Sequence, residues 1–232
     1  MGAALETVLR ALRTGATADL NALADVTQDL RQVTCADLAA DALRVIATMD
    51  DIDHLLDDCY EHPNGFTRIA LPVPAGLGRA RLHVFSSGKE SDLHNHRWPY
   101  VSVVLRGTLS EEVYAVGPGA DGTELWWHRH SQSPDRASFS LTPGERTQVH
   151  RTAVIRRSAG HVLAVDRTAL HRVTPLTSSA VTLLLEGGQT RQDSDVYASA
   201  PRPLAESRSP RHDRDTLLVL LRSLDVASAA DP

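Results

Sequence analysis

The sequence predicts a mainly β protein in which a β-barrel is preceded by a helical segment and followed by one helix. From about Phe66, short runs of β-branched and apolar residues alternate with Gly, Pro, Asp and Ser turns, a pattern typical of sandwiches and barrels. No long helical pattern interrupts these runs, which argues against a parallel βαβ fold. The 232 residues suffice for one sizeable domain with appendages,.

The first part of the chain, residues 1 to about 60, reads as helical. Apolar residues recur there at helical spacing, in the groups Leu5, Val8, Leu9, Leu12; Leu20, Leu23, Val26, Leu30; and Leu38, Ala42, Val45. Thr17 and Thr34 are expected helix starts because acidic residues follow them,. A last short helix is expected over 50–60, ended by a turn at 62–65. Because these helices are amphipathic, we expect 1–62 to pack on the outside of the barrel.

The barrel is expected over residues 63–187. Its predicted strands are 66–72, 79–85, 101–106, 109–116, 123–129, 136–141, 147–156, 161–165, 170–174 and 180–186,. Gly107 is expected in a turn between two hairpin-like strands. The remainder, 188–232, reads as a Pro-, Ser-, Arg- and Asp-rich loop over 188–212, followed by an amphipathic helix over 213–225,.

Composition narrows the function classes. Hydrophobic residues make up 42%, charged residues 23%, and the net charge is -5, which is ordinary for a soluble globular protein. Clustered Lys and Arg are lacking, so a nucleic-acid partner is not expected. Glu6 and Arg10 interrupt the first apolar stretch, so we expect no signal peptide, no membrane partner and a cytoplasmic protein,. Cys35 and Cys59 fit no disulfide framework and no C-x-x-C pattern,.

Three histidines form a candidate metal site. His94 and His96 stand two residues apart just before a predicted strand, so their side chains can point to the same side,. His171 starts another strand about 75 residues later, and a barrel can bring such positions together. Three neutral imidazoles leave coordination positions open, as a catalytic metal requires. His128 and His130 form another His-x-His, but no glycine pattern flanks them.

The spacing around these histidines resembles the motifs of the cupin superfamily, which implies a jelly-roll barrel. The first cupin motif is Gly, five residues, His-x-His, three or four residues, Glu, six residues, Gly. The chain matches it from Gly88 to Gly107, with Tyr100 in the position of the Glu. The second motif is matched by Gly160 and His171, while Asp166, Thr168 and Pro175 replace its Pro, Gly and Asn.

Within the cupins, residues 50–187 are most similar to the cysteine dioxygenase branch, which also lacks the motif Glu and binds iron with three histidines. Phe66-Thr67-Arg68 looks like the family's Tyr-Thr-Arg, and residues 170–173 match the family's sequence around its third metal ligand. The resemblance implies that Arg68 grips a substrate carboxylate, for which a planar guanidinium is suited. A solvated arginine at a strand start is the alternative.

The chain departs from that family at a late strand, where a Ser, a His and a Tyr orient dioxygen and the thiolate. Thr182, Leu184 and Glu186 stand there instead. The crosslinking Cys of some members falls at Tyr100 or Val101, so the Cys–Tyr crosslink is lost. The metal cradle is therefore expected, while thiol oxidation does not follow from the sequence.

Further pocket residues follow from these registers, each with an alternative. Tyr100 is a candidate acid or hydrogen-bond donor, or only a wall of the pocket. Glu186 is a candidate base or counter-charge, or a carboxylate facing solvent. Trp98 lines the pocket mouth or packs within a loop. His83 faces the substrate or is a satisfied core or rim histidine, and Thr182 completes the substrate-binding set.

These observations favour a metal-dependent enzyme. The first hypothesis is a non-heme Fe(II) oxygenase that takes dioxygen and a small carboxylate-bearing or amino-acid-like substrate that chelates the metal. The second is a non-oxidative isomerase, lyase, cyclase or decarboxylase using the ion as a Lewis acid, with Ni, Mn, Cu or Zn as other possible metals. The third is a ligand-binding protein without catalysis. A homodimer is expected by analogy with cupins only.

Overall fold

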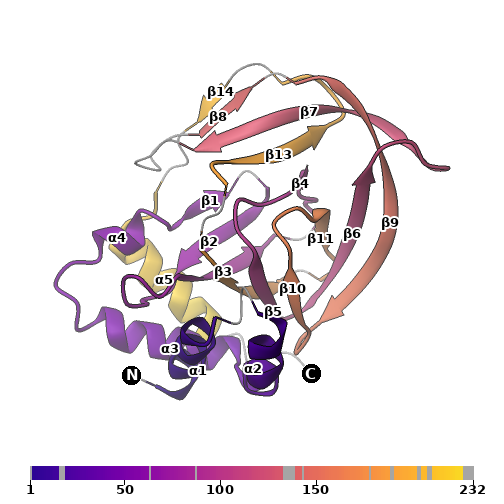
Figure 1. The fold of residues 1–232 in the computed structure, drawn as a ribbon. Coiled ribbons are helices and arrows are strands. Elements are labelled where there is room, and N and C mark those ends of the chain that lie inside the picture. Colours follow the sequence, from indigo (N-terminus) through magenta and orange to yellow (C-terminus); the bar gives the residue numbers. More distant parts are fainter. Residues whose placement is uncertain are drawn as a thin grey trace.

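The computed structural model describes residues 2–15, 19–62, 64–86, 88–132, 139–142, 144–177, 179–188, 191–202, 205–207 and 211–226. Within them, the strands form two antiparallel sheets that enclose a barrel interior (Figure 1). The first sheet has the order β1 (Tyr60–His62), β2 (Phe66–Ala70), β3 (Arg79–Phe85), β12 (Val181–Glu186), β5 (Tyr100–Arg106), β10 (Val162–Val165). The fold is thus mainly β, as the sequence predicts.

The second sheet forms the opposite wall of the barrel. Its order is β13 (Asp193–Ala198), β4 (Leu93–His94), β11 (Leu170–Pro175), β6 (Thr108–Val116), β9 (Arg146–Ser158), β7 (Thr123–Gln132), β8 (Phe139–Thr142), β14 (Ala205–Ser207). An additional pairing joins β13 to β7, which closes the upper part of this sheet on itself (Figure 1). Most of its strands therefore have no free edge there.

Both faces of β12 in the first sheet are buried, one against the cavity and the other against the hydrophobic core. Every residue of β12 is buried, although its side chains alternate between the faces. Thr182, Leu184 and Glu186 point into the barrel and line its cavity. Leu183 and Leu185 point outward and join the main hydrophobic core.

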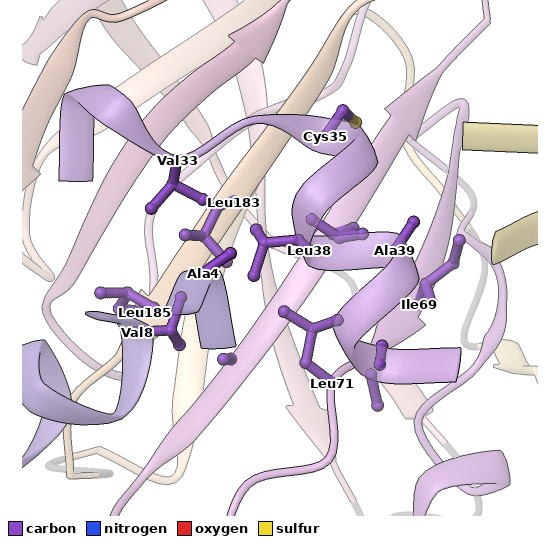
Figure 2. Packing of buried hydrophobic residues seen from close by; sticks show 14 of the residues in the cluster. Ala4, Val8, Val33, Cys35, Leu38, Ala39, Ile69, Leu71, Leu183 and Leu185 are labelled. Carbon is purple, nitrogen blue, oxygen red and sulfur yellow. The ribbon is translucent and has the colours of Figure 1, made fainter. Parts of the chain in front are cut away.

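Helices cover the outer face of the first sheet. They are α1 (Ala3–Arg13), α2 (Leu20–Gln32), α3 (Cys35–Ile46) and α5 (Arg214–Val226). Figure 2 shows Val8 and Leu38 of two helices beside Leu183 and Leu185 of β12, in one continuous cluster. Burial of these apolar faces holds the helices in place, because helices of this length are marginal alone. Among the described residues, no helix is long and apolar enough to cross a bilayer.

The helix boundaries differ from expectation in two places. Thr34 caps α3, its Oγ1 accepting from the amide of Asp37 at 3.1 Å, as predicted,. Thr17 lies outside the described residues, and Asp19 is the N-cap of α2. The helix expected over 50–60 is reduced to α4 (Asp53–Leu56). The expectation was wrong at its end because Tyr60 already pairs with Arg68 in the β1–β2 hairpin.

The ten expected strands are all present within the described residues, with shifted ends; positions 136–138 lie outside the described part. One expectation about the strands was wrong. The loop expected over 188–212 contains β13 and β14. Its strand β13 begins with three polar residues, Asp193 to Asp195, but pairs with β4 and β7 on its two sides, so pairing compensates for a weak strand pattern.

Gly107 turns the chain from one sheet to the other. It adopts φ +75°, which glycine tolerates at little cost. The expected hairpin across it was wrong, because β5 pairs with β10 and β12 whereas β6 pairs with β9 and β11. A Cβ at this position would lie 2.4 Å from Thr177 Oγ1 and 2.9 Å from Ala180 Cα. This turn fixes the first sheet against the second and thereby shapes the space between them.

Candidate metal centre

A cavity of about 420 Å³ lies between the two sheets. All nine residues singled out in the sequence line it: Arg68, His83, His94, His96, Trp98, Tyr100, His171, Thr182 and Glu186. The fold therefore brings the predicted site together, while the role of each residue stays a prediction.

The three histidines converge from two neighbouring strands. His94 ends β4 and lies opposite His171 in the β4–β11 pairing, and His96 follows in the segment after β4. One ring nitrogen from each lies within 4.8 Å of the others, and the Nε2 atoms of His96 and His171 are 2.9 Å apart. These positions are what a three-histidine metal site requires of its donors.

Hydrogen bonds fix which nitrogen of two rings faces the centre. Nδ1 of His94 lies 2.8 Å from the carbonyl oxygen of Asp92, and Nδ1 of His171 lies 2.7 Å from Oε1 of Glu111. Both oxygens accept, so each Nδ1 carries the proton and each Nε2 presents a lone pair inward. The residues thus fit a divalent metal ion.

The electrostatic surroundings keep His94 and His96 neutral. Burial, followed by the neighbouring charge of His171, lowers the pKa of His94 to about 4. Burial and the proximity of His94 hold the pKa of His96 well below its ordinary value. Neutral imidazole is the form that binds a metal, so the site is ready at neutral pH.

Glu111 belongs to the candidate site but was not predicted from the sequence. Its carboxylate accepts from His171 and from Nη1 of Arg157 at 2.8 Å, while Arg157 also donates to the carbonyl of Ser102 at 3.1 Å. Burial raises the pKa of Glu111. The hydrogen bonds and charges of His171 and Arg157 lower it by more, so the pKa lies below its ordinary value. Alternation along β6 places Glu111 on the same face as buried Leu109, a signal that could have found it.

Tyr100 stands beside the histidines. Its hydroxyl is 3.4 Å from Nε2 of His171, and its ring meets that of His96 edge-on at 4.6 Å between centroids. Burial and the charge of Glu111 raise its pKa well above the ordinary value of 10.0. Tyr100 is therefore a neutral phenol at physiological pH, able to donate a hydrogen bond at the centre.

The sequence left open that Arg68 and Glu186 face solvent. That alternative was wrong for both residues, because both side chains are buried. Arg68 is 8% exposed and Glu186 is 3% exposed. Nη1 of Arg68 donates to the hydroxyl of Tyr60, and Nη2 donates to Oε1 of Glu186 at 3.2 Å. Glu186 is thus a buried counter-charge of Arg68 rather than a strand-end carboxylate in water.

Two further arginines complete this cluster. Arg81 bonds to Glu186 and, at 2.6 Å, to Asp58, and Arg79 lies 3.7 Å from Glu186. Desolvation raises the pKa of Asp58, but the neighbouring arginines outweigh it and hold that pKa well below its usual range. Three guanidinium groups therefore face two carboxylates. Of these five side chains, Arg68 and Glu186 line the cavity, and the guanidinium of Arg68 suits an anionic group of a ligand.

Three of the predicted substrate residues carry buried polar atoms that lack a partner among the described residues. They are Nε2 of His83, Nε1 of Trp98 and Oγ1 of Thr182. His83 and Thr182 are cross-strand neighbours, and His83 stacks on Phe66 at 4.1 Å. Whether His83 contacts a substrate or is a core or rim histidine stays a prediction. Buried polar groups are normally paired, so these atoms are suited to a ligand.

Further residues without a predicted role lie on the second sheet and in the segments beside it. His130 lines the cavity beside Ser194, with Nδ1 3.4 Å from Oγ of Ser194. Arg202 donates to both carboxylate oxygens of Asp92 at 2.8 and 2.6 Å. Because the carbonyl of Asp92 holds His94, this ion pair braces the segment that carries the first ligand.

Comparisons with known proteins give distant structural neighbours only. No family model and no curated protein matches the chain. Similar solved structures include the cupin domain of CENP-C from Drosophila melanogaster, 11% identical, with 64% of this chain and 96% of that chain covered and a TM-score of 0.37. An RmlC-like cupin from Shewanella frigidimarina is 17% identical over 56% of this chain and 84% of that chain, with a TM-score of 0.35.

A formate complex of oxalate decarboxylase from Lactobacillus farciminis is also similar, at 10% identity and a TM-score of 0.34. It is covered over 33% of its length, against 60% of this chain, so the chain spans about a third of that enzyme. The TM-scores of these three neighbours are low, and the assignment of the fold therefore rests on the chain's own two-sheet barrel and strand registers.

Proposed function

We propose that the chain is a metal-dependent cupin enzyme, and specifically a non-heme Fe(II) oxygenase that acts on a small carboxylate-bearing or amino-acid-like substrate. One observation carries the proposal. Three imidazoles bring one ring nitrogen each within 4.8 Å of one another in the cavity, and no carboxylate belongs to that donor group among the described residues. Three protein ligands leave room for a substrate and dioxygen together.

The chain's own residues have separable tasks in this proposal. His94, His96 and His171 hold the ion, which when bound supplies the redox chemistry between substrate and dioxygen. Arg68, within its arginine cluster, binds the acid group of the substrate. Tyr100 keeps its proton and donates a hydrogen bond to an atom of the substrate beside His171.

A non-oxidative metal enzyme is the second candidate, and a specific observation favours it. At the late strand where a thiol dioxygenase carries its oxygen-orienting side chains, Leu184 packs against Trp98 and Tyr100, and Glu186 is held by arginines. A Lewis-acid reaction on a carbonyl or carboxylate needs no such groups. In that case Tyr100 is the candidate for proton transfer.

Anaerobic reconstitution separates these functions. The purified chain is loaded with Fe(II), or with Ni, Mn, Cu or Zn, and oxygen uptake is followed against a panel of small organic acids. We expect uptake with Fe(II) and its loss in His94→Ala. Turnover that continues without air and with Zn or Ni would refute the oxygenase and support the non-oxidative enzyme. Ligand binding that survives His94→Ala, without turnover under any condition, would leave a binding protein.

A further inference from the structure

The size of the cavity bears on the identity of the substrate. At about 420 Å³ it falls within the roughly 300–1,000 Å³ of pockets that enclose drug-sized ligands. A free amino acid with a short side chain leaves most of such a space unfilled. The substrate is therefore expected to have a second, larger part besides the acid group that faces the arginines.

One side of the cavity is apolar and lies next to the histidines. Phe66, Phe85 and Leu109 line it and form one buried cluster, against which Val173 packs. Val173 stands two residues after His171 on β11, so it lies on the same face of the strand. A ligand coordinated near His171 thus reaches an apolar surface within the same cavity.

Rings on three adjacent strands give this side a flat character. His62 stacks on Phe66 with 4.4 Å between centroids and an angle of 6°, and Phe66 stacks on His83 at 4.1 Å and 17°. Side chains stand perpendicular to a sheet, so rings stacked across neighbouring strands turn their edges inward. Ring edges are positively polarised and favour the face of another aromatic ring.

A polar pair lies between the apolar side and Arg68. Thr182 is 2% exposed, and its Oγ1 and the Nε2 of its cross-strand neighbour His83 have no partner within the described residues. His83 lies beside Arg68 on β2 and two residues before Phe85 on β3. A ligand that spans both ends passes this pair and can satisfy it.

We infer that the substrate is an aromatic acid that carries a hydrogen-bonding substituent between its carboxylate and its ring. The carboxylate faces Arg68, the substituent meets Thr182 and His83, and the ring lies against Phe66 and Phe85. This inference rests on the proposed function, because it names the substrate class of the same site.

Calorimetric titration of the full-length chain tests the inference with three acids. 3-Phenyllactate has the carboxylate, hydroxyl and ring; lactate lacks the ring; 3-phenylpropionate lacks the hydroxyl. We expect 3-phenyllactate to bind at least about tenfold more tightly than lactate, from burial of the ring. It should also bind several-fold more tightly than 3-phenylpropionate, because the hydroxyl pairs with buried polar groups.

A pair of matched substitutions then assigns the hydroxyl contact. Thr182→Val keeps the side-chain shape and should abolish the preference for 3-phenyllactate over 3-phenylpropionate while leaving the preference over lactate. Thr174→Val, outside the cavity lining on β11, should change neither ratio. Equal affinity for lactate and 3-phenyllactate, or an unchanged hydroxyl preference in Thr182→Val, would overturn the inference.

The same titrations on chelator-treated protein distinguish this inference from the proposed function. The ring and Thr182 effects arise from protein walls, so both should persist after the metal is removed. A chain that never binds a metal yet shows both effects would refute the metal enzyme alone. A chain that binds one but shows no ring preference would refute the aromatic acid alone.

Discussion

Replacement of Glu111 by glutamine is the most informative perturbation of the metal centre. The substitution keeps the shape of the side chain but removes the charge that His171 and Arg157 share. A neutral amide polarises the Nδ1 proton of His171 less than a carboxylate does, so Nε2 becomes a weaker donor. The metal affinity should fall although no ligand is changed.

The magnitude follows from the environment of this carboxylate. Loss of an outer partner of a metal-binding histidine typically reduces affinity about 10- to 100-fold, which is about 1.4–2.7 kcal/mol. The side chain of Arg157 is 6% exposed and loses its counter-charge. Removal of one member of a buried pair costs about 3–5 kcal/mol, so the free energy of unfolding should fall as well.

Two assays on matched variants separate these effects. Competition with a chromophoric chelator gives the metal affinity, and urea unfolding of the metal-free chain gives the stability. Glu112→Gln is the control, because Glu112 faces outward and bonds to Tyr114 and exposed Arg151; it should leave metal affinity unchanged. The double variant Glu111→Gln with Arg157→Met should regain stability but keep the reduced affinity.

The reasoning fails if Glu111→Gln is folded and binds the metal as tightly as the original chain. It also fails if Glu112→Gln weakens metal binding to the same degree, because the effect would then be one of net charge rather than of the bond to His171.

Three further predictions concern the turn, the pH response and the acid site. Gly107→Ala should lower the free energy of unfolding by more than about 1 kcal/mol and by more than Gly76→Ala, whose Cβ would meet nothing within 4 Å at φ +86°; equal urea midpoints would contradict this. Burial and the charge of Arg97 lower the pKa of His130 from 6.5 to about 4, so the unfolded chain binds that proton first and stability should fall as pH drops from about 6.5 towards 4. The decline of the free energy of unfolding with falling pH should be shallower in His130→Asn. An identical pH profile of stability in the variant and the original chain would refute this prediction. Arg68→Met should raise KM for the acid that is turned over by at least about tenfold, with little change for a neutral analogue; an equal rise for both would exclude a carboxylate contact.

Most of the barrel could be predicted from the sequence because its strands carry strong local signals. The alternation of β3 and the apolar run of β12 are examples,. The strand β13 could not be found in this way, since only three of its six residues are apolar and its stability comes from pairing with β4 and β7. The helix predicted over 50–60 was too long, because the pairing of Tyr60 with Arg68 in the β1–β2 hairpin outweighed the local helical periodicity.

The candidate site shows the same division between local and distant information. The sequence predicted the three histidines because the glycines spaced around them mark the turns that position His94, His96 and His171. Glu111 was missed, since its importance depends on the β6–β11 pairing that brings it to His171. The sequence also gave no sign that Arg81 and Asp58 join Arg68 and Glu186 in one cluster.

The central claim is that His94, His96 and His171 bind one metal ion. Elemental analysis of the purified full-length chain, repeated after anaerobic loading with Fe(II) and removal of excess metal, tests it most directly. The account predicts close to one metal ion per chain and none in a folded His94→Ala, His171→Ala double variant. A loaded chain without metal, or a double variant that retains it, would contradict the account.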